Sequence, residues 1–130
     1  MKWYFKCFKQ YADFSGRARR KEYWMFFLFN FIFSFLFFIL SYVTSYAIEK
    51  PPHLPSGYDP GLFGLYVLAT LFPMLAVSVR RLHDVGKSGW NYFIGLIPIV
   101  GAIILIIWFC TDSQADKNKW GANPKLATSD

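Results

Sequence analysis

Charged residues are absent from three long stretches of the chain, and this pattern restricts the folds open to it more than any other feature. The stretches cover residues 23–48, 60–79 and 88–111, and each exceeds the roughly 18 residues that mark a membrane span. Lipid offers no hydrogen-bond partner to an open strand, and about 20 helical residues cross the roughly 30 Å hydrocarbon layer. The sequence therefore indicates an all-α, polytopic membrane protein with a single domain over 1–130 and three transmembrane helices, at 23–48, 60–79 and 89–111.

The basic residues indicate how such a protein is oriented. Of its 14 lysines and arginines, seven lie in the lead segment 1–22 and three in the connection 80–88, whereas the connection 49–59 contains one. Cytoplasmic loops carry an excess of Lys and Arg, so we expect the N-terminus and the 80–88 loop in the cytoplasm and the 49–59 loop outside. If 89–111 crosses the membrane, the tail 112–130 lies outside as well.

Two prolines lie inside the predicted spans. Pro73 and Pro98 each remove a backbone hydrogen bond from an α-helix, so we expect kinks in the second and third transmembrane helices. Gly101 follows Pro98 closely, and a re-entrant turn at this point is an alternative that would return the tail to the cytoplasm. Such a turn needs cover from the rest of the protein, because its backbone cannot face lipid.

The first eleven residues have an amphipathic pattern, with aromatic residues on one side of a helical wheel and lysines on the other. This pattern predicts an interfacial helix over 3–11 whose lysines face anionic lipid, each cation contributing about 1 kcal/mol. Packing on the protein's own cytoplasmic face is the alternative. Aromatic side chains favour the headgroup region, and the predicted membrane-interface anchors are Trp3, Tyr4, Phe8, Tyr11, Tyr23, Trp24 and Trp90.

Four short motifs resemble those of the YhaH-like family of small bacterial inner-membrane proteins, whose domain (DUF805) has no known function. The motifs are FSGRARRKEYW at 14–24, RRLHDVGKSGW at 80–90, IPIVG at 97–101 and NKWGANP at 118–124. One departure is that the Pro-Gly pair usually found before the C-terminal motif is absent. The resemblance implies a location in the bacterial inner membrane, with several spans, and carries no reaction, cofactor or ligand.

The most concentrated polar group follows the second predicted span. We take it, together with two arginines of the lead segment, as a hypothetical anion- or partner-binding site formed by Arg17, Arg20, Arg80, Arg81, His83 and Asp84. Paired guanidinium contacts suit phosphate, and Asp84 is expected to pair with one of these arginines. Topology alone also explains basic residues at this place, so the group could simply be a positive-inside signal.

Several other classes of site are disfavoured by the sequence. The two histidines, His53 and His83, fall on opposite predicted faces without metal-ligand spacing, and we predict no metal site, no cofactor and no catalytic residues. A disulfide between Cys7 and Cys110 is excluded in the three-span topology. The spans contain no ionisable side chain other than tyrosine, which argues against an active transporter.

The remaining interpretation is a non-enzymatic membrane module that binds lipids or partners through a basic cytoplasmic face. With a net charge of +6, its expected partners are anionic membrane lipids, while a homo-oligomer or a membrane-protein partner stays open. No nucleic-acid-binding motif is present. The alternatives are a passive pore or carrier formed by an oligomer, and a lipid-headgroup enzyme that uses His83 and Asp84.

Overall fold

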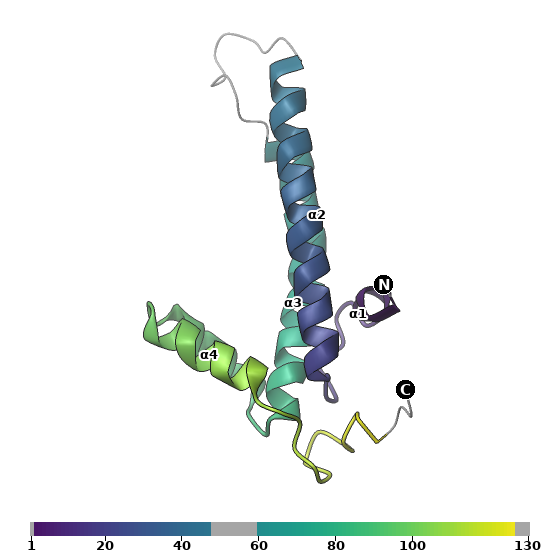
Figure 1. Ribbon diagram of the computed structural model, residues 1–130, viewed down its shortest axis with the longest axis vertical. Helices are drawn as coiled ribbons and strands as arrows, with labels where there is room; N and C mark the ends of the chain where they lie inside the picture. The colour runs from purple at the N-terminus through teal and green to yellow at the C-terminus, as the bar shows by residue number, and fades with distance from the viewer. Residues whose placement is uncertain (1, 48–59, 127–130) are drawn as a thin grey trace.

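The computed structural model describes residues 2–47 and 60–126, and the described part is helical. The helices are α1 (Lys2–Lys9), α2 (Arg20–Ala47), α3 (Pro60–Asp84), the 3-10 helix η1 (Gly89–Leu96) and α4 (Val100–Cys110). The helices α2 and α3 lie side by side along the long axis, and α4 extends sideways near one end (Figure 1). The lead segment 2–22, the end of α3 and the tail 111–126 meet at this end, which we call the base. The predicted loop 49–59 lies outside the described residues.

Two helices, α2 and α3, are long and apolar enough to cross a membrane. Their 28 and 25 residues correspond to about 42 and 37 Å at about 1.5 Å per residue, which exceeds the roughly 30 Å hydrocarbon layer. Large apolar side chains on both helices point outward, including Phe31 and Leu65, which are 63% and 68% exposed. Such exposure is unfavourable in water and expected in lipid, so the prediction of a helical membrane protein is confirmed.

Helix α3 continues past the predicted end of the second span at residue 79. It runs to Asp84, and the turn before η1 contains Gly86 with a φ of 76°, a conformation that glycine adopts without strain. The predicted loop 80–88 is therefore mostly helix. The reason is that Arg80, Arg81 and Asp84 form ion pairs inside the protein and do not need water.

The prediction of one kinked transmembrane helix over 89–111 is wrong. The chain runs outward in η1, reverses at residues 97–99 and returns in α4, and the two arms contact each other (Figure 1). Pro98 cannot donate a helix hydrogen bond, and Ile99 has a φ of 63°, so the backbone turns back. A Cβ on Gly101 would lie 1.8 Å from the carbonyl oxygen of Ile94, so glycine permits the close approach. The chain reversal that we gave as the alternative is the conformation observed.

The tail returns to the base, beside the lead segment. The Arg17 side chain donates hydrogen bonds to the backbone oxygens of Gln114 and Asp116 at 2.7 and 2.9 Å. The expectation that the tail 112–130 lies on the face opposite the N-terminus is therefore wrong for its described residues. The cause is the hairpin, because two short arms leave the chain on the side where it entered.

Helix α1 packs on the protein itself, as the alternative for the lead segment proposed. Tyr4 is 8% exposed, Cys7 is fully buried, and the Tyr4 ring stacks on Phe26 of α2 with centroids 5.3 Å apart. Tyr23 is buried against Phe109 of α4 at 4.4 Å. The prediction of Tyr4 and Tyr23 as membrane-interface anchors needs correction, because burial leaves their rings no surface for headgroups.

The other predicted anchors retain exposed surface. Trp90 is 79% and Tyr11 40% exposed, and Trp3, Phe8 and Trp24 are half-buried. Trp24 also donates its indole N–H to the backbone oxygen of Phe109 at 3.2 Å. For these five residues, a position at the membrane interface stays a prediction.

Candidate functional site

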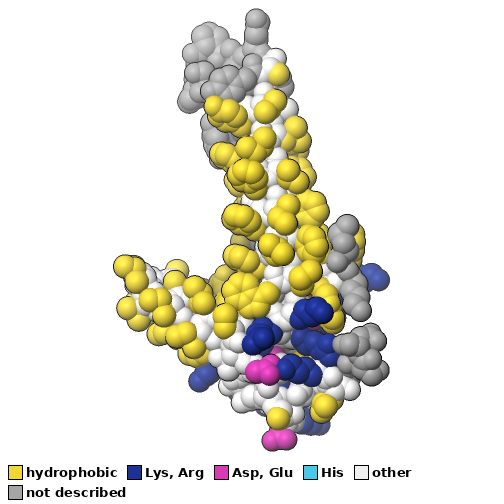
Figure 2. All heavy atoms as spheres, viewed as in Figure 1, with side chains coloured by type: hydrophobic (Ala, Val, Ile, Leu, Met, Phe, Trp, Pro, Cys, Tyr) yellow, Lys and Arg dark blue, Asp and Glu magenta, His cyan; other side chains and the backbone are white. Residues whose placement is uncertain are grey.

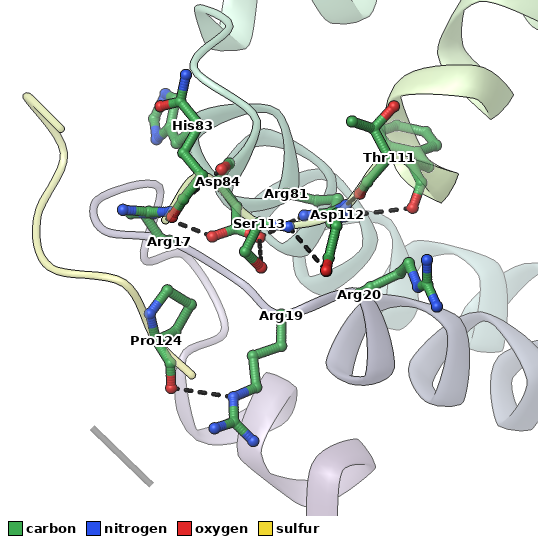
Figure 3. Close-up of polar contacts among 12 residues, drawn as sticks. Arg17, Arg19, Arg20, Arg81, His83, Asp84, Thr111, Asp112, Ser113 and Pro124 are labelled. Atoms are coloured by element: carbon green, nitrogen blue, oxygen red, sulfur yellow. Dashed lines mark hydrogen bonds and ion pairs between the residues drawn. The ribbon is translucent and has the colours of Figure 1, made fainter. Parts of the chain in front are cut away.

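Asp84, at the end of α3, is the centre of a buried ion-pair network (Figure 3). One carboxylate oxygen accepts from Nε of Arg17 at 3.0 Å, and the other accepts from Arg81 and from the Ser113 hydroxyl. The side chains of Arg17, Arg81 and Asp84 are at most 1% exposed. The expected pairing of Asp84 with an arginine is confirmed, and it joins the lead segment, α3 and the tail.

The guanidinium groups of Arg17 and Arg81 are largely occupied by acceptors from the protein. Arg17 donates to four backbone oxygens in addition to the Asp84 carboxylate, and these belong to Asp84, Gln114, Asp116 and Gly121. Arg81 donates to the backbone oxygens of Phe109, at 3.3 Å, and Thr111. Breaking such a pair leaves an uncompensated buried charge, at a cost of about 3–5 kcal/mol. This arrangement stabilises the junction between the lead, α3 and the tail and leaves little capacity for a ligand.

A second buried network is centred on Glu22, near the start of α2. Its carboxylate accepts from Nζ of Lys6 at 2.6 Å and from Nη1 of Arg80 at 3.1 Å, and Arg80 also contacts the Gln10 side chain. Glu22 is fully buried, whereas Lys6 is partly exposed. Within the described residues, Nε and Nη2 of Arg80 are buried without a hydrogen-bond partner. This network ties α1 to both long helices.

His83 belongs to a different set of contacts. Its Nδ1 lies 3.1 Å from the backbone oxygen of Gly16, which can only accept, so Nδ1 carries the proton in this contact. The ring stacks on Trp120 with centroids 4.4 Å apart, and Asn118 donates to the His83 backbone oxygen at 2.9 Å. Although adjacent in sequence, His83 and Asp84 share no side-chain hydrogen bond in the described structure, so the arrangement of an acid–base pair is not formed.

The predicted site residues thus separate into two groups. Arg17, Arg80, Arg81, His83 and Asp84 come together at the base, and all five are buried. The sixth, Arg20, is exposed and donates to the backbone oxygen of Cys110 at 3.0 Å. No group of three or more His, Cys, Asp or Glu residues that could hold a metal ion occurs within the described residues.

Sequence reasoning missed the contribution of the tail and of Glu22. Gln114, Asn118 and Trp120 cover the end of α3, and a short turn closed by hydrogen bonds between Asn118 and Gly121 positions Trp120. The signal available was the motif at 118–124, which we used for the resemblance without assigning it a contact. Arg80, one of the two cations paired with Glu22, lies 58 residues away in the sequence, a separation that no local pattern reveals.

The fold and the base define a small helical membrane protein with two membrane-length helices, a short apolar hairpin and one polar end braced by buried ion pairs. The family described as "protein of unknown function (DUF805)" matches residues 11–122. The chain belongs to this family.

Curated relatives extend the match over almost the whole chain. The chain is 40% identical to inner membrane protein YhaI of Escherichia coli strain K12 over 129 residues, which is 98% of this chain and 99% of the relative. It is 39% identical to inner membrane protein YhaH of the same strain over 126 residues, or 97% of this chain and 98% of the relative. No solved structure matches. The chain is therefore an inner-membrane protein of a family without an assigned function.

Proposed function

We propose that the protein is a non-enzymatic, multi-pass module of the inner membrane. The positively charged surface of its base binds anionic lipid headgroups on the cytoplasmic side. The observation that carries this proposal is the abrupt boundary between two kinds of surface. Apolar side chains cover the shaft formed by α2 and α3 as well as the hairpin, and charged side chains gather below them at the base (Figure 2). The boundary lies where a membrane surface would meet a protein embedded in this way.

The exposed charges at the base are mainly positive. Among the described residues, the exposed cations outnumber the exposed acids, which are Asp112 and Asp116. The exposed cations are Lys9, Arg20, Lys21, Lys87, Lys117, Lys119 and Lys125. Each cation held near an anionic membrane surface contributes about 1 kcal/mol of binding, so the base as a whole favours anionic lipid.

The same charges support an orientation with the N-terminus in the cytoplasm. The lead segment, the end of α3 and the tail all belong to the base, so each basic cluster of the described chain lies on one side of the predicted bilayer (Figure 1). Excess Lys and Arg favour the cytoplasmic side. In this arrangement α2 and α3 span the membrane and the hairpin enters from the cytoplasmic side.

Tryptophan fluorescence in vesicles tests the lipid preference. The protein is reconstituted into vesicles of phosphatidylcholine and phosphatidylglycerol, with either lipid brominated so that it quenches nearby tryptophans. We expect the brominated anionic lipid to quench several-fold more effectively at low salt, and the preference to fall as salt screens the surface charges. Equal quenching by the two lipids at low salt would contradict the proposal.

Charge variants separate this surface effect from nonspecific changes. The double variant Lys9→Gln with Lys21→Gln should reduce the preference, because both lysines are exposed at the base. The matched control is Lys125→Gln with Asp112→Asn, which removes an exposed ion pair and keeps the net charge. If the control lowers the preference as much as the lysine variant does, the effect does not come from the basic surface.

A further inference from the structure

A groove runs between α3 and the hairpin and has two chambers. Both chambers are lined by Leu75 of α3 and by Tyr92 and Phe93 of η1, and each has a volume of about 460 Å³. The chamber nearer the base is also bordered by His83 and Ser88. The other chamber extends between η1 and α4 and is lined by apolar and aromatic residues and glycine. The groove is therefore mainly apolar along its length, and its end nearer the base, which we call the polar end, adds the polar side chains of His83 and Ser88.

The groove is bordered by side chains that face the surroundings of the protein. Phe93 is 56%, Leu96 is 78% and Trp90 is 79% exposed. Since these residues belong to the apolar surface assigned to lipid, the groove would open into the hydrocarbon layer. An apolar space there is filled by acyl chains, because water gains no hydrogen bonds from such a lining.

The hairpin is short enough to stay within one leaflet, and α4 slants away from the shaft formed by α2 and α3 (Figure 1). The eight residues of η1 span about 16 Å at about 2.0 Å per residue, and the eleven residues of α4 span about 16 Å at about 1.5 Å per residue. One leaflet accounts for about half of the roughly 30 Å hydrocarbon layer. An acyl chain lying along η1 could thus remain in the cytoplasmic leaflet, with its headgroup at the polar end.

The polar end offers positive charge and a hydrogen-bond donor. Two exposed lysines lie beside this end of the groove without lining it. Lys87 directly precedes Ser88, and its ammonium group lies 5.3 Å from the centroid of the Trp108 ring. The ammonium group of Lys119 lies 4.2 Å from the centroid of Trp120, whose ring stacks on His83. The Ser88 hydroxyl accepts from the Trp90 backbone N–H at 3.4 Å, so its own hydrogen can be donated.

Most of the carboxylates at the base are engaged within the protein. Asp84 is buried between Arg17 and Arg81, Asp112 pairs with Lys125, and Asp13 accepts hydrogen bonds from Ser15. Asp116 is exposed, and the exposed Lys117 directly follows it. The exposed lysines beside this end of the groove therefore favour a phosphate group.

We propose that the groove binds one anionic glycerophospholipid of the cytoplasmic leaflet. An acyl chain lies between Leu75 and Phe93, and the phosphate lies beside Ser88, Lys87 and Lys119. This site deepens the proposed function, since both require anionic lipid at the base, but it differs from a general surface preference in holding one lipid molecule. It also places the ligand outside the arginine cluster, whose guanidinium groups mainly contact the protein.

Native mass spectrometry of the full chain tests the site. The protein is purified from nanodiscs containing equal amounts of phosphatidylglycerol and phosphatidylethanolamine, stripped with mild detergent, and analysed for lipid that remains bound. We expect one retained lipid per chain, with phosphatidylglycerol enriched at least fivefold. Leu75→Trp fills the part shared by both chambers and should abolish retention, whereas Leu65→Trp, on the exposed surface of α3, should not.

The headgroup contact is tested by Lys87→Gln with Lys119→Gln, which should retain lipid but lose the enrichment. Lys9→Gln with Lys21→Gln removes the same charge elsewhere on the base and should keep it. Retention unaffected by Leu75→Trp, or no retained lipid in the wild type, would overturn the groove. The surface preference for anionic lipid is measured separately, by fluorescence quenching. A failure of the groove therefore leaves that preference standing, and a failure of the preference is detected without measuring retained lipid.

Discussion

Replacement of Arg17 by lysine should release the tail from the base. Arg17 donates to the Asp84 carboxylate and to four backbone oxygens, three of them in the tail. Lysine keeps the charge, but a single ammonium group cannot reach acceptors arranged around a planar guanidinium. Three hydrogen bonds to tail oxygens are lost, each contributing about 1–1.5 kcal/mol, so the loss is about 3–4.5 kcal/mol. With about 1.4 kcal/mol per tenfold change, tail opening should become about a hundredfold to a thousandfold more frequent.

Hydrogen exchange of the Gln114 amide measures this opening. In the folded protein this amide donates to the Asp84 backbone oxygen at 3.1 Å, so it exchanges only when the tail leaves α3. We expect its exchange in Arg17→Lys to accelerate by at least about a hundredfold, while amides in the middle of α2 remain protected. Arg19→Lys is the matched control, because Arg19 is half-exposed and contacts the later tail residues Pro124 and Lys125. Unchanged protection of Gln114 in Arg17→Lys would refute the bracing role of Arg17.

Three further predictions concern the hairpin, the lead helix and the side of the tail. Gly101→Ala should prevent closure of the hairpin, because the new Cβ would lie 1.8 Å from the Ile94 carbonyl oxygen. The distance between spin labels on the two arms should then increase. Gly64→Ala is the control, because its Cβ would have nothing within 4 Å, and it should leave this distance unchanged. Burial raises the pKa of Cys7 to about 12, so its thiol should stay neutral and unreactive toward maleimide at pH 8. Glu22→Gln should loosen α1 and accelerate that labelling, and equal rates would show that the ion pair does not hold α1. In intact cells carrying Cys110→Ser, Lys87→Cys and Lys117→Cys should both be protected from an impermeant thiol reagent, and labelling of Lys117→Cys alone would place the tail outside.

The charge-free windows predicted the two long helices well and failed at the hairpin. At 23–48 and 60–79, each end of the charge-free window lies within about five residues of the corresponding helix end. The reason is that lipid-facing helices need an uninterrupted apolar run. At 88–111 the same run of apolar residues is divided into two arms. Length and hydropathy cannot distinguish one span from two half-length arms, since both need the same composition. The distinguishing residues were Pro98 and Gly101, which we first read as a kink.

The site was predicted as a set of neighbours and only in part as a set of contacts. The proximity of Arg81 to Asp84 follows from helical spacing, and the pairing with Arg17 was an expectation drawn from the two motifs. The pairing of Glu22 with Arg80 depends on how α2 packs on α3, which a single sequence does not specify. The groove could not be predicted from the sequence either, because it also depends on tertiary packing. It forms only when the chain reverses at Pro98 and η1 lies beside α3.

The two kinds of basic residue at the base have different roles because their side chains differ. The buried cations are arginines, namely Arg17, Arg80 and Arg81, and within the described residues the exposed ones are lysines with the exception of Arg20. A planar guanidinium can satisfy several fixed acceptors at once, as Arg17 does, whereas an ammonium on a flexible stem acts as a hydrated point charge suited to a fluid lipid surface. Both kinds count equally in the positive-inside signal during insertion. After folding, the three buried arginines are paired with Glu22 and Asp84 and lie away from the surface, so the exposed lysines and Arg20 are the cations that a lipid meets.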